Sequence, residues 1–371
     1  MKIFCSTIEL TNAIFTVINA VPQKKTIPIL EGIKITASGN ELVVTATDLE
    51  LSLEKKIKAD VKKEGEVVVP GKLIADFIKK IPVETIELDA TVKNELKLKY
   101  SVSLDDKKVV FKCFPPDEYP VIRNVQEELS FTIFQKELKD VINKTIFAAA
   151  TDDIRPVLRG CLFDIQDGIL TAVALDGFRL AKTVKKLECH KGDCKLIIPV
   201  RTLQEIRKVL EKEDELTTIF VQNNYLSIEI GDFRLTSRLI DGEFIAYEKI
   251  IPAEFTTVVT ANSTAVKEGL DRASVISRSD KQNLIKIEAK EKSLKISSET
   301  EVGNLNETVD AELTGVDLLI AFNAKFMIDC MTAIDDGTIK LNMNSSKMPA
   351  VITPVSGDEF LYLILPVRIT S

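Results

Sequence analysis

The chain has 371 residues, of which 45% are hydrophobic and 28% charged, and its formal net charge is −7. This composition is that of a globular protein and excludes a disordered chain. The length predicts two or three domains rather than one core. No run approaches the roughly 18 apolar residues of a membrane helix. Polar residues at positions 7, 9, 11 and 12 interrupt any signal-peptide run, so we expect a cytoplasmic protein.

The motifs of nucleotide and metal enzymes are absent from the sequence: there is no P-loop, no G-x-G-x-x-G and no H-E-x-x-H. His190 is the single histidine and lies in a loop rich in lysine and glycine, with no nucleophile elbow nearby. We therefore expect no catalytic residue, no cofactor and no enzymatic activity.

Six cysteines are mostly scattered singly, as expected for reduced thiols. One cluster, "ECHKGDC", brings Cys189, His190 and Cys194 together as possible metal ligands. The spacing lacks the C-x-x-C form, and no second pair follows, so an ordinary turn without metal is the favoured interpretation. A redox role for the cluster stays open.

In the first third, hydrophobic periodicity predicts a helix over residues 6–21 and hairpins over 27–56. A second helix over 69–82 precedes alternating strands that reach residue 100. The stretch 115–128, "PPDEYPVIRNVQEE", combines proline and charge and predicts a linker.

The second third repeats this order, with a helix over 134–150, hairpins over 155–184 and a helix over 198–210. Its hairpins are similar to those of the first third. The matched positions are Leu30 with Leu158, Gly32 with Gly160, and Asp48 with Asp176. The Asp-Gly of "TAVALDGFRLAKTV" is a strong hairpin signal, and a second linker is expected over 241–254.

A weaker third copy follows, with helices over 262–277 and 322–334 around the hairpins of 283–309. The period of roughly 125 residues is that of a domain and not of a solenoid repeat. We predict an α+β fold of three topologically similar domains, each with antiparallel sheets and two helices. The expected boundaries are 1–127, 128–252 and 253–371.

Charge is uneven between the predicted helices and the rest. The helix-like spans 6–20, 71–81, 134–149, 200–212, 262–276 and 315–334 carry 13 Lys/Arg against 10 Asp/Glu, a net +3, which leaves −10 elsewhere. This indicates one face suited to a polyanion. Chance and helix-surface lysines explain the same number about equally well.

The three repeats, "LDGFRLA" and the terminal "YLILPVRI" together resemble the bacterial sliding clamp, the beta subunit of DNA polymerase III, over the whole chain. The resemblance implies a head-to-tail homodimeric ring of six domains whose helices surround double-stranded DNA without reading its sequence. It also implies a non-catalytic, nucleoid-associated processivity factor. Expected partners are the polymerase III alpha subunit, the ATP-driven clamp loader and other replication and repair proteins with clamp-binding motifs.

The resemblance further implies a pocket for partner peptides that carry a glutamine and bulky apolar residues. The matching positions are Leu158, Leu175, Gly177, Phe178, Arg179, Leu180, Ile245, Lys249, Ile250, Asn323, Phe326, Leu363, Ile364, Leu365, Pro366, Val367 and Arg368. Taken alone, Arg179 would be a surface salt-bridge residue, whereas the resemblance favours the pocket rim. Leu175, Phe178 and Ile245 stand where threonine, a polar residue and proline are frequent, so we expect an unusually apolar pocket, and the preferred peptide stays open.

DNA-facing positions implied by the resemblance are Lys24, Lys72, Arg155 and Arg201, while Asp152 and Asp153 are doubtful contacts. The seam of the ring is expected to join residues 107–113 to residues 272–278. The interface residues are Val109, Phe111, Val275 and Ile276.

Two alternatives remain at this point. One is a clamp-like scaffold that binds partners but is not the replicative ring. The other is a hydrolase of antiparallel sheets that uses paired carboxylates, which no motif supports.

Overall fold

The computed structural model describes the chain except for residues 23–26, 103–104, 153, 336 and 369–371. The chain divides into two compact units. Unit 1 comprises Met1–Thr132 and Leu216–Arg238, and unit 2 comprises Ile133–Glu215 and Leu239–Ser371. Among the described residues, no helix combines the length and the apolar character needed to cross a membrane.

The described part of unit 1 holds two α-helices, α1 (Thr7–Val17) and α2 (Gly71–Ile78), and two antiparallel sheets. One sheet has the order β5 (Asp60–Lys63), β1 (Lys2–Ser6), β7 (Thr85–Asp89), β8 (Glu95–Val102), β9 (Asp105–Lys112). The other contains β16 (Leu216–Gln222), β17 (Tyr225–Ile230), β18 (Phe233–Arg238), β4 (Leu51–Lys58), β3 (Glu41–Thr47), β2 (Gly32–Ser38), β6 (Gly65–Pro70). Strand β10 (Leu129–Phe134) runs along the chain from unit 1 into unit 2.

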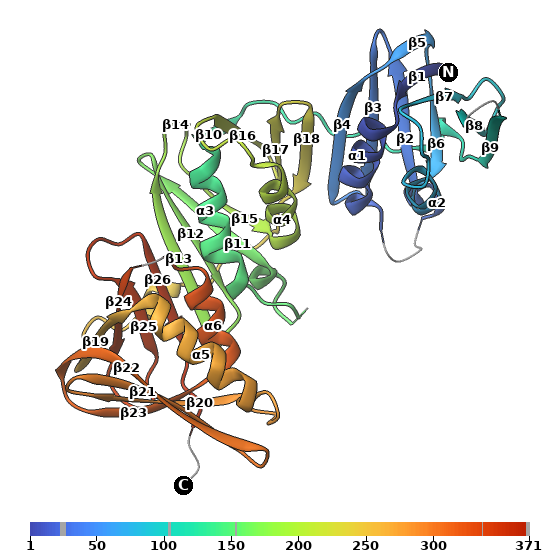
Figure 1. Ribbon diagram of the computed structural model, residues 1–371. Coiled ribbons are helices and arrows are strands. Elements are labelled where there is room, and N and C mark those ends of the chain that lie inside the picture. Colours follow the sequence, from blue (N-terminus) through green and yellow to red (C-terminus); the bar gives the residue numbers. More distant parts are fainter. Residues whose placement is uncertain (23–26, 103–104, 153, 336, 369–371) are drawn as a thin grey trace. The chain divides into compact units, whose positions relative to one another are not determined.

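Among its described residues, unit 2 holds four α-helices: α3 (Gln135–Thr145), α4 (Val200–Val209), α5 (Ser263–Ser277) and α6 (Ala324–Thr332). Its large antiparallel sheet has the order β15 (Cys194–Pro199), β11 (Gly160–Gln166), β12 (Ile169–Leu175), β13 (Arg179–Lys186), β26 (Phe360–Ile364), β25 (Ala350–Pro354), β24 (Thr338–Met343), β19 (Thr257–Asn262), β22 (Gly303–Gly315), β21 (Ser293–Thr300), β20 (Leu284–Lys290), β23 (Leu318–Asn323). The short β14 (Cys189–Lys191) precedes β15 along the chain. Helices α5 and α6 lie side by side against their strands (Figure 1).

The helices form where the sequence pattern predicts them, with shorter α-helical parts. Ser6 is the N-cap of helix α1, and its hydroxyl accepts the Glu9 N–H at 3.3 Å. The helix buries Leu10, Ile14 and Val17 on one face. It ends at Val17, and a 3₁₀ turn carries the chain to Ala20. The predicted helix over 6–21 is therefore correct in place and too long by one turn.

The predicted repeat is confirmed by strand register. Lys34 pairs with Thr45 in the first copy, and Leu162 pairs with Val173, each residue 128 later, in the second. In the third copy Lys286 pairs with Ser297, each 252 after the first. The weaker third copy thus has the same hairpin geometry, although its sequence similarity is low.

Two further strand pairs join different copies of the repeat. Strand β4 pairs with β18 in unit 1, and β13 pairs with β26 in unit 2. In each joint, the last strand of the first hairpin set of one copy (β4 or β13) pairs with the last strand of the second hairpin set of the next copy (β18 or β26). We call these pairs the first joint and the second joint.

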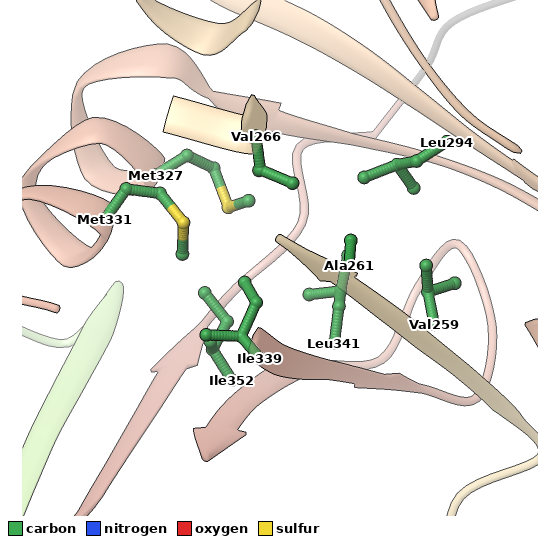
Figure 2. A pocket seen from close by; sticks show the side chains of 9 residues that line it. All are labelled: Val259, Ala261, Val266, Leu294, Met327, Met331, Ile339, Leu341 and Ile352. Carbon is green, nitrogen blue, oxygen red and sulfur yellow. The ribbon is translucent and has the colours of Figure 1, made fainter. Parts of the chain in front are cut away.

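A small void lies in the described interior of the last third (Figure 2). Its volume is about 10 Å³ and its lining is entirely apolar: Val259, Ala261, Val266, Leu294, Met327, Met331, Ile339, Leu341 and Ile352. A void of this size is at the limit for one water molecule and offers no polar partner. It is a packing gap between α5, α6 and their sheet.

Candidate functional site

The Asp-Gly turn between β12 and β13 presents one aromatic side chain to solvent. Asp176 Oδ1 accepts the N–H groups of Phe178 at 2.9 Å and Arg179 at 3.0 Å. Gly177 adopts φ 91°, a conformation in which a side chain would be strained. The turn therefore holds Phe178 in a fixed place with 61% of its surface exposed.

Arg179 points the other way and is only 7% exposed. Its Nε donates to Asp176 Oδ2 at 3.0 Å, its Nη1 to Asp329 Oδ2 at 2.6 Å, and its Nη2 to the Phe147 carbonyl at 2.7 Å. The guanidinium carbon also lies 4.6 Å from the centre of the Phe326 ring. The expectation of a rim residue needs correction: a long cation with two nearby carboxylates is held behind the rim and joins β13 to α6.

The predicted residues Phe178, Phe326 and Leu365 meet at the surface. The rings of Phe178 and Phe326 are stacked, with centroids 6.1 Å apart and planes at 26°. The Phe178 carbonyl accepts the Leu365 N–H at 2.8 Å, and Leu365 is 38% exposed. Residues distant in the sequence thus form one apolar surface, with Phe178 and Leu365 exposed and Phe326 half-buried, which we call the aromatic platform (Phe178 and Phe326, with Leu365 beside it).

A separate cluster of buried apolar residues lies in the same unit. It contains four residues of the predicted pocket: Leu158, Leu175, Leu180 and Leu363. Val173, Ile197, Tyr247 and Val351 belong to the same cluster. The second joint contributes to the cluster, because Leu180 pairs with Leu363. Ile245 packs against it and Ile364 is also buried. These residues expose little of their surface.

The remaining predicted residues surround this core in different ways. Asn323 accepts the Lys325 N–H at 3.0 Å and caps α6, which is a structural role. Lys249 and Ile250 are exposed on a 3₁₀ turn, Tyr247–Ile250. The chain after β26 passes through half-buried Pro366 and Val367 to exposed Arg368, and the Val367 N–H donates to the Ala321 carbonyl at 2.8 Å.

Two contributors to the site are missing from the sequence prediction, Phe147 and Asp329. Both touch Arg179, which lies 32 residues from Phe147 and 150 from Asp329 along the chain. The only available signal was the spacing of Asp329 three residues after Phe326 on one helix. That signal has meaning only once Arg179 is known to be buried.

The expected DNA-facing residues are separate exposed cations. Lys72 lies on α2, Arg201 on α4, and Arg155 just before a 3₁₀ turn at Pro156–Arg159. Asp152 is exposed, and its Oδ1 accepts the Ile154 N–H at 3.1 Å. Lys24 and Asp153 lie outside the described residues.

One of the four expected seam residues is placed differently by the structure. Phe111 is 3% exposed within its own unit and packs edge-to-face on Phe77, with ring centroids 5.6 Å apart, so its side chain offers little surface to a second copy. Val109, on the same face of β9, is half-buried. On α5, Ile276 is half-buried and Val275 is 68% exposed.

The cluster "ECHKGDC" has no metal-site geometry. Cys189 is exposed on β14, and burial raises the pKa of the half-buried Cys194 thiol to about 11. His190 Nε2 lies 3.6 Å from Asp193 Oδ1. Across the described part of the chain, no three His, Cys, Asp or Glu side chains are arranged to hold a metal ion.

Comparison with known proteins gives one consistent family. Models of the N-terminal, central and C-terminal domains of the DNA polymerase III beta subunit match residues 1–123, 132–245 and 248–368. The chain belongs to the DNA polymerase III beta-subunit family. Its function is that of a processivity clamp in DNA replication.

Individual clamps are similar over nearly the whole chain. The beta sliding clamp of Halalkalibacterium halodurans is 33% identical over 367 residues, 94% of each chain, and that of Staphylococcus epidermidis is 31% identical over 96% of each. The crystal structure of the Bacillus subtilis sliding clamp has a TM-score of 0.94 at 28% identity and covers both chains fully. The beta subunit of Thermotoga maritima has a TM-score of 0.89.

The three matched clamp domains explain the two joints. Strand β4 belongs to the N-terminal match and β18 to the central match, while β13 belongs to the central match and β26 to the C-terminal match. Because the first joint pairs β18 with β4, strands of the central domain are grouped with unit 1. Each joint is therefore a continuous sheet between consecutive clamp domains.

Proposed function

We propose that two copies of this chain close head to tail into a six-domain ring around double-stranded DNA and tether partner proteins through the surface at the aromatic platform. The observation that carries this proposal is the match of all three beta-subunit domains in order along the chain. The proposed domains are 1–127, 128–252 and 253–371. The ring itself is non-catalytic and works in the cytoplasm at the nucleoid.

Ring closure is supported by two strand edges that are left open. In the described part of unit 1, β9 ends its sheet and pairs only with β8. In unit 2, residues 303–310 of β22 pair with β21 on one side, and β19 pairs with β22 only from Ala311 onward. Exposed edges of this length invite pairing with another chain. Strand β22 is the third-copy equivalent of β4 and β13, and β9 is the first-copy equivalent of β18 and β26.

The internal repeat specifies how these edges would pair. The same 2.8 Å backbone hydrogen bond marks the start of the second strand set in each copy: Thr7 N to Glu84 O, Gln135 N to Glu215 O, and Ser263 N to Gly337 O. From this bond we follow the strand pairings by the same number of residues in each copy. The path leads to Val109 in the first copy, Leu235 in the second and Tyr362 in the third, so these three residues are equivalent.

Leu235 pairs with Leu53 in the first joint, and Tyr362 pairs with Ala181 in the second. The residue equivalent to Leu53 in the third copy is Leu305, 252 positions later. We therefore infer that Val109 of one copy lies opposite Leu305 of the other. A methyl carbon of Ile276 lies 3.8 Å from where a Gly303 side chain would begin, so α5 flanks the same edge.

The seam is tested by placing charge on it. Val275→Asp and Leu305→Asp should each sediment as folded monomers, since a desolvated, unpaired carboxylate in an interface costs several kcal/mol. Val316→Asp, at an exposed position outside the open edge, is the matched control and should remain dimeric. Dimers of both seam variants at low concentration would move the interface elsewhere.

Encirclement is tested by the topology of the DNA. Ion-pair binding alone loses affinity with salt at a slope near −0.9Z for Z neutralised phosphates, and the helix-like spans carry only a net +3. Loaded protein should therefore stay on circular DNA in salt that removes directly bound protein, and linearising the circle should release it. Charge reversal at Lys24, Lys72, Arg155 and Arg201 should impair loading more than retention. Equal retention on linear and circular DNA would exclude a ring.

The proposed partners are the polymerase III alpha subunit, the clamp loader and other proteins with clamp-binding motifs. The exposed apolar surface of Phe178 and Leu365 fits bulky apolar side chains of an extended peptide. Deleting residues 365–371 should abolish peptide binding and leave the dimer intact. Peptide affinity that survives this deletion would contradict the proposed site.

A further inference from the structure

We infer that two charged residues of the seam, Lys107 and Glu307, exchange partners when the ring closes. In the single chain each is paired within its own copy, and in the ring each faces the other across the seam. Arg272 is the stand-by partner that keeps Glu307 paired whenever the seam is open. The inference rests on the proposed ring and specifies how its seam opens without leaving an unpaired charge.

The strand register places the two residues opposite one another. Val109 of one copy lies opposite Leu305 of the other, so the antiparallel pairing of β9 with β22 puts Lys107 opposite Glu307. Residues two apart on a strand share a face. Both charged side chains therefore lie on the face of Val109 and Leu305, which is the side on which α5 contributes Arg272.

Both charges already have partners in the single chain. Arg272 donates from Nε to Glu307 Oε2 at 2.9 Å and to Oε1 at 3.1 Å, and its Nη2 also contacts Oε1. Hydrogen bonding from Arg272 lowers the pKa of the Glu307 carboxyl, so this group is charged at neutral pH. Lys107 Nζ contacts the carboxylate of Asp105, two residues earlier on β9. An open seam therefore leaves neither charge unpaired.

The arrival of Lys107 at Glu307 favours the release of Arg272. Two cations at one carboxylate repel each other, and Arg272 has a second carboxylate within reach. Its Nη1 lies 3.8 Å from Oε2 of Glu268, one turn earlier on α5. Closure thus replaces the Arg272–Glu307 pair by a pair across the seam and leaves Arg272 beside Glu268.

The two joints within the chain carry aromatic residues at the equivalent place. Phe233 lies opposite Lys55 in the first joint, and Phe360 lies opposite Thr183 in the second. Both rings are buried, with 3% and 6% of their surface exposed. These joints join domains of one chain and stay closed. An aromatic residue at position 107 would be exposed on the strand edge of every open ring, and apolar edges invite aggregation.

The test measures the dissociation constant of the full-length dimer by sedimentation equilibrium at low salt. Arg272→Gln removes the partner that Glu307 has in the open chain, so the dimer should become about 1.4- to 5-fold tighter. Lys107→Gln removes the partner across the seam and should loosen the dimer by a similar factor. Both changes should vanish in about 1 M salt, which screens exposed pairs. Lys267→Gln, the matched control, removes a charge elsewhere on α5 and should leave the constant unchanged.

Lys107→Phe copies the two joints and tests the same position in the opposite direction. The new ring should be buried in the closed seam, while Glu307 keeps Arg272 as its partner in both states. The dimer should therefore become about 10-fold tighter or more. Dissociation of labelled dimers after dilution should slow accordingly.

Each other outcome is decisive. An unchanged or looser dimer in Arg272→Gln would overturn the stand-by role. No loosening in Lys107→Gln, or no tightening in Lys107→Phe, would overturn the placement of Lys107 opposite Glu307. These results would leave the proposed ring in place. An unmodified chain that stays monomeric at every concentration would overturn the ring and the inference with it. Thermal unfolding of each variant confirms that the chain is folded.

Discussion

The turns at 47–51 and 175–179 have the same backbone and different side chains. In the first, Asp48 Oδ1 accepts the N–H groups of Glu50 at 3.1 Å and Leu51 at 2.8 Å. In the second, Asp176 accepts from the equivalent N–H groups at 2.9 and 3.0 Å. Even the next backbone bond, from each aspartate N–H to the carbonyl three residues on, is 3.2 Å in both turns.

What differs is the three residues that follow the aspartate. The first turn has Leu-Glu-Leu, with Leu51 buried and Glu50 paired on the surface with Arg238. The second has Gly-Phe-Arg, with a buried cation and an exposed ring. The repeated backbone builds a joint between clamp domains in both places. The side chains decide that only the second joint also presents an aromatic platform.

The largest expected effect comes from giving the second turn the buried residue of the first. Arg179→Leu removes the cation between Asp176 and Asp329, and should lower the free energy of unfolding by about 2–4 kcal/mol because a partly buried carboxylate loses its partner. Lys325 still contacts Asp329, which keeps the loss below the upper end of the range.

Arg238→Leu is the matched change in the first joint. The Arg238–Glu50 pair is exposed and its N–O distance is 3.6 Å, so the expected loss is under about 1 kcal/mol. Urea denaturation measures both. Similar losses for the two variants would mean that Arg179 is no more important than a surface cation.

The next effect concerns binding and not stability. Phe178→Glu copies the first turn and should weaken peptide binding by about 10-fold or more, because a charged group would be desolvated against the bound peptide. The reverse change, Glu50→Phe, should create no peptide affinity, since the first turn lacks Phe326 and the buried arginine. Titration with a fluorescent peptide that carries one glutamine and two leucines measures both variants. Peptide binding at Glu50→Phe would show that an exposed ring alone is enough.

A smaller effect is expected at the second turn glycine. Gly177→Ala meets no atom within 4 Å, but φ 91° is unfavourable for any residue with a Cβ. The expected loss of unfolding free energy is about 1–2 kcal/mol. No loss in thermal or urea unfolding would mean that the turn relaxes to another conformation.

The smallest effect is expected at the equivalent position of the first turn, where Leu49 already adopts φ 77°. Leu49→Gly relieves the strain of a side chain in this region and adds a similar entropy cost in the unfolded chain. The two terms should nearly cancel, with a change within about 0.5 kcal/mol. A loss as large as that of Gly177→Ala would show that the exposed Leu49 side chain makes a stabilising contact.

Much of the fold was predictable from local pattern. Helix α5 coincides with the predicted 262–277 because Asn262 caps it and Val266, Leu270 and Ala273 form one apolar face. The equivalence of Asp48 and Asp176 could also be predicted from the sequence, because an Asx turn needs only an aspartate and the next three residues. These features depend on residues that are close together in the sequence.

The direction of Phe111 and the environment of Arg179 were not predictable in this way. Phe111 lies opposite Leu96 and faces the interior because of the register of β8 and β9, and a shift of one residue would have turned it outward. Arg179 finds Asp329 only because β13 pairs with β26 and brings α6 beside the turn. Neither arrangement can be inferred from the residues that are adjacent in the sequence.

The sequence by itself determined the helices, the hairpins, their threefold repetition and the family, because each rests on local periodicity or on residue order. Only the tertiary structure decided that Phe178 is exposed on a stacked partner while its neighbour Arg179 is buried between carboxylates. Burial and pairing of a side chain depend on strands that meet from distant parts of the chain. Phe178 ends the turn and Arg179 begins β13, and the groups that each side chain meets are set by the fold.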